Sequence, residues 1–375
     1  MAGIYIHIPF CKQRCKYCAF YSTTLHNLQD RYTNALCLEL GMRKNYIKEG
    51  IDTIYFGGGT PSVLKKEQLQ KIIKTIEENF EVSPQAERTI EANPDDLTSE
   101  YLEALYSLSF NRISMGVQSF NDKQLQRLGR RHTAQKVREA VDNARNVGFE
   151  NISIDLIFAL PASTSQEWLY DLDQAISLHP THISAYNLTY EEGTPLYNLL
   201  KKGEITPLSE EENIEQFEIL IEKLSQAGYV HYEISNFALP GKESKHNSSY
   251  WHDIPYLGCG AAAHSYNRTS RQWNISDIKK YIEAIEEGSM ECEIEELSEN
   301  DRYNDAVLTR LRTADGIPLE WLRENFDNKY LKYLQENATS HIKNGTLEEK
   351  GNCIALTKKG IFISDAIIRD LIYIE

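Results

Sequence analysis

Residues 5–18 read YIHIPFCKQRCKYC and place three cysteines, Cys11, Cys15 and Cys18, directly after a short apolar run. Thiols at this density indicate a metal centre or disulfides, and three thiols cannot pair with one another without leaving one over. A metal centre is therefore favoured. Structural zinc normally takes four protein ligands, and His7, the nearby fourth candidate, fits a strand better. A cubane iron–sulfur cluster held by three cysteines instead leaves one iron open.

The composition fits a soluble globular chain. The 375 residues are 41% hydrophobic and 25% charged, with a formal net charge of -15. A chain of this length predicts one large domain and a smaller one. No apolar run approaches the roughly 20 residues of a membrane span, and no signal peptide precedes the first strand. We therefore expect a cytoplasmic protein with reduced thiols. The negative charge argues against nucleic acid as the main partner.

Short β-branched or aromatic runs alternate with helical patterns from residue 4 to about residue 189, which is typical of a βα repeat. The candidate strands are residues 4–8, 52–56, 87–92, 112–117, 151–158 and 182–188. The candidate helices between them are residues 30–43, 66–78, 99–108, 133–147 and 166–178. Thr164 and Glu167 form a capping-box pair, and Gly148 is a helix stop. The pattern predicts an α/β fold, a partial, open six-stranded βα barrel, with a doubly wound sheet as the competitor.

Three regions are expected along the chain. The barrel occupies residues 1–235 and includes a helix at 211–227. Residues 236–295 are predicted to be an irregular extension that ends in an acidic linker. Residues 296–375 suggest a small, winged-helix-like domain, with helices at 303–311, 319–326, 331–343 and 359–371 and a hairpin turn at 350–352. An interaction or covering role is favoured over DNA binding for this domain, because its Lys and Arg residues do not cluster.

Polar residues stand where the predicted strands end. Gly58, Gly59 and Thr60 follow the second strand, and Glu91 and Gln118 end the third and fourth. Asp155 lies within the apolar fifth strand, where a buried acid needs a cation or hydroxyl as partner. Glycines let backbone groups approach a ligand closely, although a tight turn alone also calls for glycine. Because barrel sites lie at the carboxyl ends of the strands, we expect one site there.

The C-x3-C-x2-C spacing, with Tyr17 before the last cysteine, resembles the signature of the radical S-adenosylmethionine (SAM) superfamily. The resemblance implies a [4Fe-4S] cluster on the three cysteines, with SAM chelating the open iron. It places Gly58, Gly59 and Thr60 at the methionine part of SAM. The resemblance also places Tyr5 near the cluster and Tyr17 at the adenine, which its backbone supports. The residues that it places around the methionine and ribose are Glu91, Gln118, Arg130 and Asp155. Arg131 is the alternative to Arg130.

The sequence is further similar to the oxygen-independent coproporphyrinogen oxidase group. The similarity rests on residues 5–11, on Gly-Val-Gln-Ser-Phe at 116–120, on Ile-Asp-Leu-Ile at 154–157 and on the C-terminal module. Two departures argue against the oxidase itself. Phe20 stands where the oxidase has a further cysteine, and the oxidase carries an extension before the cluster strand, whereas this sequence begins a few residues upstream of it.

Residues 246–251 read HNSSYW, a run that resembles the HemW branch of haem chaperones. An imidazole is a ready axial ligand for haem iron, and aromatic side chains can lie against a flat macrocycle, so His246 is the predicted haem ligand. The competing interpretation is a surface histidine beside core aromatics. Three other histidines remain candidate second ligands: His231, His252 and His264.

The resemblance implies a haem chaperone that binds haem and delivers it to acceptor proteins such as respiratory enzymes. SAM cleavage would need an electron donor, and whether the chain is an enzyme stays open, as does a homodimer. The first alternative is a radical SAM enzyme that decarboxylates a porphyrinogen. The second is a zinc-stabilised βα protein.

Overall fold

Six parallel strands form the centre of the fold in the computed structural model, which describes residues 1–374. They are β1 (Ala2–Ile8), β2 (Ile51–Gly58), β3 (Val82–Ala92), β4 (Arg112–Gln118), β5 (Asn151–Phe158) and β6 (His182–Asn187). Their order in the sheet is their order in the chain, and all neighbours are parallel. A doubly wound sheet would reverse direction at a switch point. The predicted open, partial barrel is therefore confirmed.

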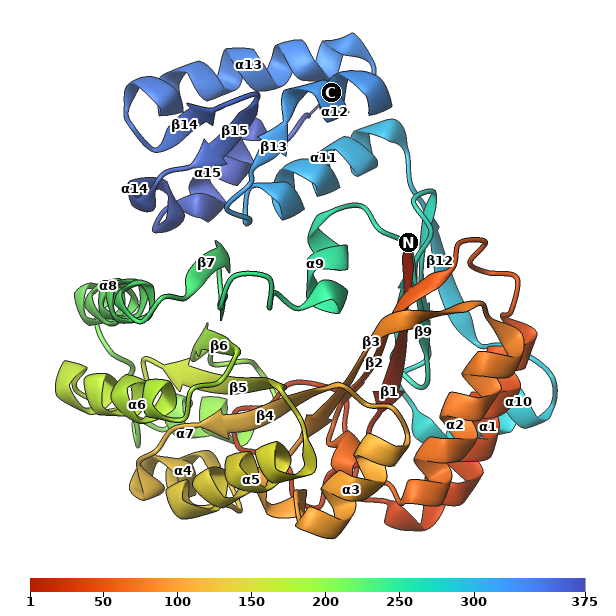
Figure 1. The fold of residues 1–375 in the computed structure, drawn as a ribbon. Helices are drawn as coiled ribbons and strands as arrows, with labels where there is room; N and C mark the ends of the chain where they lie inside the picture. Colours follow the sequence, from red (N-terminus) through yellow and green to blue (C-terminus); the bar gives the residue numbers. More distant parts are fainter. Residues whose placement is uncertain (375) are drawn as a thin grey trace.

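Helices connect successive strands and cover the outer face of the curved sheet (Figure 1). They are α1 (Gln29–Met42), α2 (Lys66–Asn79), α3 (Ser99–Ser107), α4 (Asp122–Leu128), α5 (Ala134–Val147) and α6 (Ser165–Ser177), with short 3-10 turns at His26–Leu28, Pro61–Val63 and Pro94–Asp96. The predicted capping box joins Thr164 and Glu167 at the start of α6. Gly148 ends α5 with φ of 113°, a left-handed conformation that glycine adopts without strain.

Two further helices follow β6, namely α7 (Pro195–Lys201) and α8 (Glu210–Gln226). The second was predicted from its apolar stripe, and its Leu220 and Leu224 are fully buried. Phe217 of α8 stacks on Phe158 of β5, with ring centroids 5.8 Å apart. Helix α8 therefore packs against β5 and beside α6.

Residues 236–295 are ordered, so the prediction of an irregular extension was wrong. After β7 (Val230–Glu233) the segment contains β8 (Asn236–Ala238), α9 (Lys245–Trp251), β9 (Tyr256–Cys259), β10 (His264–Tyr266), β11 (Ser270–Asn274), α10 (Ile278–Glu286) and β12 (Cys292–Glu296). Strand β9 pairs in parallel with β1, and the sheet continues through β10 and β11 to β12. The predicted acidic linker is therefore the outermost strand of a twelve-stranded sheet.

A buried carboxylate explains why this polar segment folds. Glu39 of α1 is fully buried and accepts hydrogen bonds from Gly260 N at 2.8 Å and from Tyr281 Oη at 2.6 Å. The guanidinium of Arg43 lies 3.2 Å from the same carboxylate and donates to Gly258 O at 2.8 Å. These contacts compensate the desolvation of both charges and hold the extension against α1.

The C-terminal domain has its own apolar core, built from residues between Tyr303 and Leu371. Its elements are α11 (Glu299–Arg310), β13 (Ile317–Pro318), α12 (Leu319–Asn325), α13 (Asn328–Lys343), β14 (Leu347–Lys350), β15 (Cys353–Leu356), α14 (Lys358–Ile361) and α15 (Ser364–Leu371). The predicted hairpin between β14 and β15 is confirmed. The predicted final helix is two helices, since the chain leaves helical geometry at Ile363, where φ is -123°.

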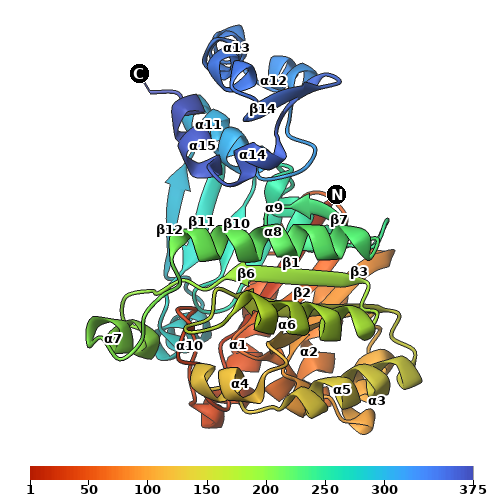
Figure 2. The same cartoon turned by 90° about the vertical axis from the view of Figure 1, so that its left-hand side faces the viewer.

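The C-terminal domain docks on β7 and α8. Ala314 N donates to Tyr232 O at 2.9 Å, and Ile234 N donates to Arg312 O at 3.0 Å. The ring of Phe362 meets Phe217 of α8 at a centroid distance of 5.5 Å. Figure 2 shows α8 between the C-terminal helices and α6. The domain thus lies on the side of the sheet opposite α1–α6.

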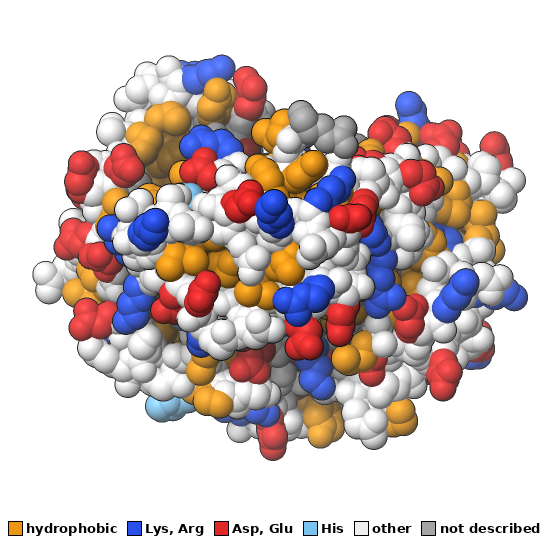
Figure 3. Space-filling model, turned by 90° about the horizontal axis from the view of Figure 1, so that it is seen from above, with side chains coloured by type: hydrophobic (Ala, Val, Ile, Leu, Met, Phe, Trp, Pro, Cys, Tyr) orange, Lys and Arg blue, Asp and Glu red, His pale blue; other side chains and the backbone are white. Residues whose placement is uncertain are grey.

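Within residues 1–374, no helix combines the length and apolar character that a bilayer crossing requires. Seen from the side of the C-terminal domain, basic and acidic side chains are interspersed over the surface (Figure 3). On this face they form no single basic area of the kind that phosphate backbones bind.

Candidate functional site

A cavity of about 660 Å³ opens at the carboxyl ends of the barrel strands. Most of the residues that the sequence singled out line it together: Cys11, Cys15, Tyr17, Cys18, Gly58, Gly59, Thr60, Glu91, Gln118, Arg130 and Asp155. They come from the loops or strand ends of β1 to β5, as expected for a barrel of this kind. Tyr5 and His246 are not among the lining residues.

The cysteine loop is fixed by backbone contacts on two sides. Cys11 N donates to Thr23 O at 2.9 Å, and this hydrogen bond joins the start of the loop to its end. Lys16 N donates to Leu128 O at 2.9 Å, and Gln13 Nε2 donates to Gly129 O at 3.1 Å. The loop is therefore held against the end of α4, and its thiols face the cavity.

The three thiols differ in their surroundings. Burial raises the pKa of Cys11 and of Cys18. Thr60 Oγ1 donates to Cys11 Sγ at 3.5 Å, and Arg130 Nη1 donates to Cys15 Sγ at 3.3 Å. Donors of this kind stabilise the thiolate form that a metal requires. Among residues 1–374, no three His, Cys, Asp or Glu side chains are gathered closely enough for one metal ion.

The glycine segment packs directly on the end of β1. Gly58 has φ of 110°, and a Cβ there would lie 2.5 Å from the ring of His7. A Cβ on Gly59 would lie 2.7 Å from the carbonyl carbon of Pro9. Glycine is therefore needed at both positions for contacts inside the protein, whether or not a ligand also approaches the segment.

Two buried acids face the cavity from β3 and β5. Glu91 accepts hydrogen bonds from Tyr55 Oη at 2.8 Å and from Gly58 N at 3.0 Å. Asp155 accepts one from Ser114 Oγ at 3.1 Å, the hydroxyl partner expected for an acid in an apolar strand. Burial raises the pKa of Glu91 to about 7 and that of Asp155 to about 6. Both carboxyls therefore exchange protons close to neutral pH.

The raised pKa of Glu91 predicts a pH dependence of stability. A carboxyl whose folded pKa is raised stabilises the fold below its unfolded pKa, and this stabilisation is lost as the pH rises through about 7. Gln does not ionise, so Glu91→Gln is expected to reduce this loss of unfolding free energy by up to roughly 3 kcal/mol. Urea unfolding of the metal-free protein at pH 4.5 and pH 7.5 measures the difference. Glu78→Gln, at an exposed position on α2, is the control, and equal pH dependence in all three proteins would contradict the prediction.

Arg130 lies between the cysteine loop and β4. Besides Cys15, it donates through Nη2 to Gly116 O. Its Nε is buried and has no hydrogen-bond partner within residues 1–374. Arg131, the alternative from the sequence, pairs with Asp96 at 3.4 Å. Arg130 is therefore the arginine that lies beside the thiols and has an unpaired N–H donor, its Nε.

Tyr17 and Gln118 complete the wall. Tyr17 packs on the apolar cluster that includes Leu128 and Leu196, and burial raises its pKa far above the usual range. Gln118 has φ of 69°, a left-handed conformation that is uncommon outside glycine. Such strain is typical of residues aimed at a functional site.

Tyr5 lies inside the barrel, beneath the cavity. Its Oη is 3.1 Å from His7 Nδ1, and its ring stacks on Tyr55 at a centroid distance of 6.1 Å. Tyr55 in turn donates to Glu91, which lines the cavity. Tyr5 is therefore linked to the cavity wall through Tyr55.

His246 lies at the other end of the barrel. A Cβ on Gly3 would lie 3.1 Å from its ring, and Gly3 and Ile8 are roughly 17 Å apart along β1 at the usual strand rise. The side chain is 1% exposed, so it is not the surface histidine of the competing interpretation. Its Nδ1 is 2.8 Å from Thr53 Oγ1, and its Nε2 is 2.9 Å from Tyr250 Oη. In this conformation both nitrogens are engaged.

The other candidate haem ligands lie on β7 and in the extension. His264 is exposed on β10 and stacks on Trp273 at 5.9 Å. His252 follows α9, and its Nδ1 is 2.8 Å from Ser248 O. His231 stacks on Phe237 at 4.2 Å. His264 is the most accessible of the three.

Some residues in or near the cavity were not identified from the sequence. Tyr186 and Asn187, at the end of β6, line it as well, and the rule that selected the ends of the other strands would have found them. Arg112 of β4 is 1% exposed, and its Nε and Nη1 have no hydrogen-bond partner within residues 1–374. Arg112 is the first residue of β4, and the sequence at this position does not indicate a buried charge beneath Glu91 and Asp155.

Comparison with known proteins assigns the class. Residues 5–175 match the family model of the Radical SAM superfamily, and residues 297–363 match that of the HemN C-terminal domain. The fold is similar to that of coproporphyrinogen III oxidase (HemN) from Escherichia coli, with a TM-score of 0.86 and 24% identity, covering 99% of this chain and 90% of that one. The open barrel and its three-cysteine cavity are those of a radical SAM protein.

Relatives narrow the class to one family. Heme chaperone HemW of Bacillus subtilis (strain 168) is 36% identical over 377 residues, which cover 98% of each chain. Heme chaperone HemW of Lactococcus lactis subsp. lactis (strain IL1403) is 35% identical, over 97% of this chain and 95% of its own. The chain belongs to the HemW heme chaperone family.

Proposed function

We propose that this protein is a haem chaperone, which binds haem and passes it to haem-accepting proteins such as respiratory enzymes. The observation that carries the proposal is the similarity to curated heme chaperones over nearly the full length of both chains. Phe20, which is 72% exposed at the cavity mouth, supports it against the porphyrinogen decarboxylase alternative, because that enzyme's further cysteine would stand there.

The cavity fits a [4Fe-4S] cluster on Cys11, Cys15 and Cys18. All three are free thiols, and Thr60 and Arg130 donate to two of the sulfurs. Once bound, such a cluster supplies one-electron chemistry and one iron that is open to a non-protein ligand. The loop contacts described above hold the cysteine loop against the end of α4.

SAM is the proposed ligand of the remaining space. The unpaired Nε of Arg130 is a donor for a carboxylate, and Glu91 and Asp155 are acceptors for amino or hydroxyl groups. Gly58, Gly59 and Thr60 present backbone groups along one wall. Tyr17 and Gln118 lie on the wall, and Tyr5 supports Glu91 through Tyr55.

His246 is retained as the proposed axial ligand of haem. Burial lowers its pKa to about 3, so its imidazole is neutral at physiological pH, which is the form that binds a metal. Ligation through Nε2 requires the Tyr250 phenol to turn away. Tyr55 then separates His246 from the cluster cavity, because its ring stacks on His246 at 5.0 Å and its hydroxyl donates to Glu91.

The cellular setting stays a prediction from the sequence: a cytoplasmic protein that takes electrons from a donor protein and hands haem to an acceptor. A homodimer is also kept as a prediction. Size-exclusion chromatography with light scattering, with and without haem, measures whether the protein is a homodimer.

A haem titration tests the proposed function. The reconstituted protein is expected to bind haem saturably, with a shifted Soret band, and to transfer it to an apo haem protein. In parallel, the protein receives coproporphyrinogen, SAM and a reductant under anaerobic conditions. Steady decarboxylation of the porphyrinogen, without saturable haem binding, would contradict the chaperone proposal and favour the enzyme.

A further inference from the structure

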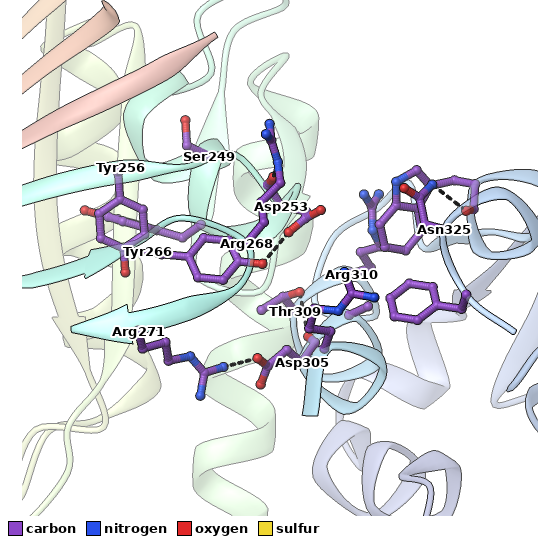
Figure 4. Close-up of a pocket in the computed structure, with 15 residues that line it drawn as sticks. Ser249, Asp253, Tyr256, Tyr266, Arg268, Arg271, Asp305, Thr309, Arg310 and Asn325 are labelled. Atoms are coloured by element: carbon purple, nitrogen blue, oxygen red, sulfur yellow. Dashed lines mark hydrogen bonds and ion pairs between the residues drawn. The ribbon is translucent and has the colours of Figure 1, made fainter. Parts of the chain in front are cut away.

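A second cavity, of about 260 Å³, lies between the sheet extension and the C-terminal domain (Figure 4). One wall comes from the end of α9 and the strands β9 to β11, and the other comes from α11 and α12. Ser249 and Tyr250, within the HNSSYW run, belong to the first wall. The cavity is therefore next to the helix that carries His246 and distinct from the cluster cavity.

The lining is rich in arginine, although the whole chain has a net charge of -15. Arg268, Arg271, Arg302 and Arg310 line the cavity, against two carboxylates. Two of these arginines are already neutralised. Arg271 pairs with Asp305, as Figure 4 shows, and Arg268 lies 2.8 Å from Glu49. The cavity keeps an excess of positive charge.

Arg310 and Arg302 make no ion pair and no side-chain hydrogen bond with any of residues 1–374. Arg310 is only 7% exposed, and its guanidinium lies 3.7 Å from the ring centre of Trp321. Arg302 faces Phe326 at 5.4 Å in the same way. Cation–π contact orients a guanidinium but leaves its N–H donors free. The Asp253 carboxylate acts on Arg310 without forming an ion pair with it, and a buried guanidinium without a direct anionic partner is costly, so an anionic ligand would stabilise it.

The remaining lining describes the body of that ligand. Tyr250, Tyr256 and Tyr266 line one side, and Trp321 and Phe326 line the other. Aromatic walls favour a flat, apolar body. The volume of 260 Å³ is below the roughly 300 Å³ at which pockets for whole drug-sized ligands begin. The cavity therefore accepts one charged edge of a large flat molecule.

We propose that this cavity binds the propionate edge of haem, with Arg302 and Arg310 as the two carboxylate partners. The inference rests on the proposed haem function and adds the site at which the carboxylates are recognised. Arg302, Asp305, Thr309 and Arg310 recur on one face of α11, so the C-terminal domain supplies both free cations. Tyr250 joins the cavity to His246 by its hydrogen bond, so a macrocycle that displaces this phenol frees Nε2 of the imidazole.

Haem and haem dimethyl ester distinguish the parts of the proposal, because the ester keeps the iron and the macrocycle but has no carboxylates. Both are titrated into the wild-type protein and into Arg310→Met, from the same dilute detergent. Arg323→Met, on an exposed turn of α12 outside the cavity, is the matched control. Because Arg310 has no ion pair, its replacement by Met is expected to leave the melting temperature unchanged or raised.

The wild-type protein is expected to bind haem about tenfold or more tightly than the ester, the usual scale of a charged hydrogen bond. Arg310→Met is expected to lose part of this preference for haem over the ester, because Arg302 still offers a partner to one carboxylate, and its affinity for the ester is expected to stay unchanged. Arg323→Met is expected to match the wild type. Arg302→Met gives the same test if Arg310→Met does not fold. Saturable binding of both compounds with equal affinity in the wild type would overturn the propionate site and leave the haem function standing. Binding of neither compound would overturn both.

Discussion

Anaerobic reconstitution of Cys11→Ala/Cys15→Ala/Cys18→Ala with iron and sulfide is expected to leave almost no protein-bound iron, whereas the parent protein takes up about four irons per chain, as a cubane requires. The three thiols are the cysteines that line the large cavity. The other cysteines, Cys37, Cys259, Cys292 and Cys353, do not line it. Iron and acid-labile sulfide, measured after gel filtration, give the result.

The matched control removes three cysteines that lie outside the cavity, as Cys37→Ala/Cys292→Ala/Cys353→Ala. These thiols are also free and only partly buried, so the control has the same number of thiols left for adventitious iron. It is expected to retain the iron content of the parent. If the first variant holds as much iron and sulfide as this control, the cluster assignment is wrong.

Replacing His246 by Ala is expected to weaken haem binding by more than the roughly 10–100-fold that loss of an outer partner of a metal ligand costs. The Soret band is expected to shift, because the axial ligand changes. The substitution also leaves the Thr53 hydroxyl and the Tyr250 phenol without their imidazole partner, which costs about 1–3 kcal/mol for each buried group. Stability must therefore be measured beside affinity.

Tyr250→Phe separates ligation from stability. It removes the partner of Nε2 and keeps the aromatic ring, so the nitrogen no longer has to leave a hydrogen bond before it binds iron. Haem affinity is expected to rise about two- to tenfold, since a buried hydrogen bond contributes about 0.5–1.5 kcal/mol net. Thr53→Val is the control, because it frees Nδ1 alone. Unchanged haem spectra in His246→Ala would show that another residue, such as exposed His264, is the ligand.

The barrel could be predicted from the sequence because its strands are buried on both faces. Ile4, Ile6 and Ile8 are fully buried in β1, and such runs alternate regularly with amphipathic helices. The cavity followed from one geometric rule, since parallel strands bring their carboxyl ends together. Local patterns were sufficient for these parts of the fold.

The extension could not be predicted in this way, because its strands are short and polar. Strand β9 is fixed by pairing with β1, more than 200 positions away in the chain, and a Cβ on Gly258 would lie 2.0 Å from His264 O. The burial of His246 also depends on distant residues. Its ring lies 5.0 Å from that of Tyr55 on β2, a contact that a six-residue run does not disclose. Tertiary packing decided both outcomes.

Strand β12 ends the sheet with a charged border. Glu293, Glu295 and Glu296 are all exposed on it, and its backbone groups on the outer side face no further strand formed by residues 1–374. The unpaired backbone groups of an edge strand can form hydrogen bonds with a strand of a second chain. Acidic side chains oppose such pairing between two copies, because like charges would lie opposite one another on the paired strands. The sheet therefore resists edge-to-edge aggregation at this border. Any pairing of two copies must use another surface.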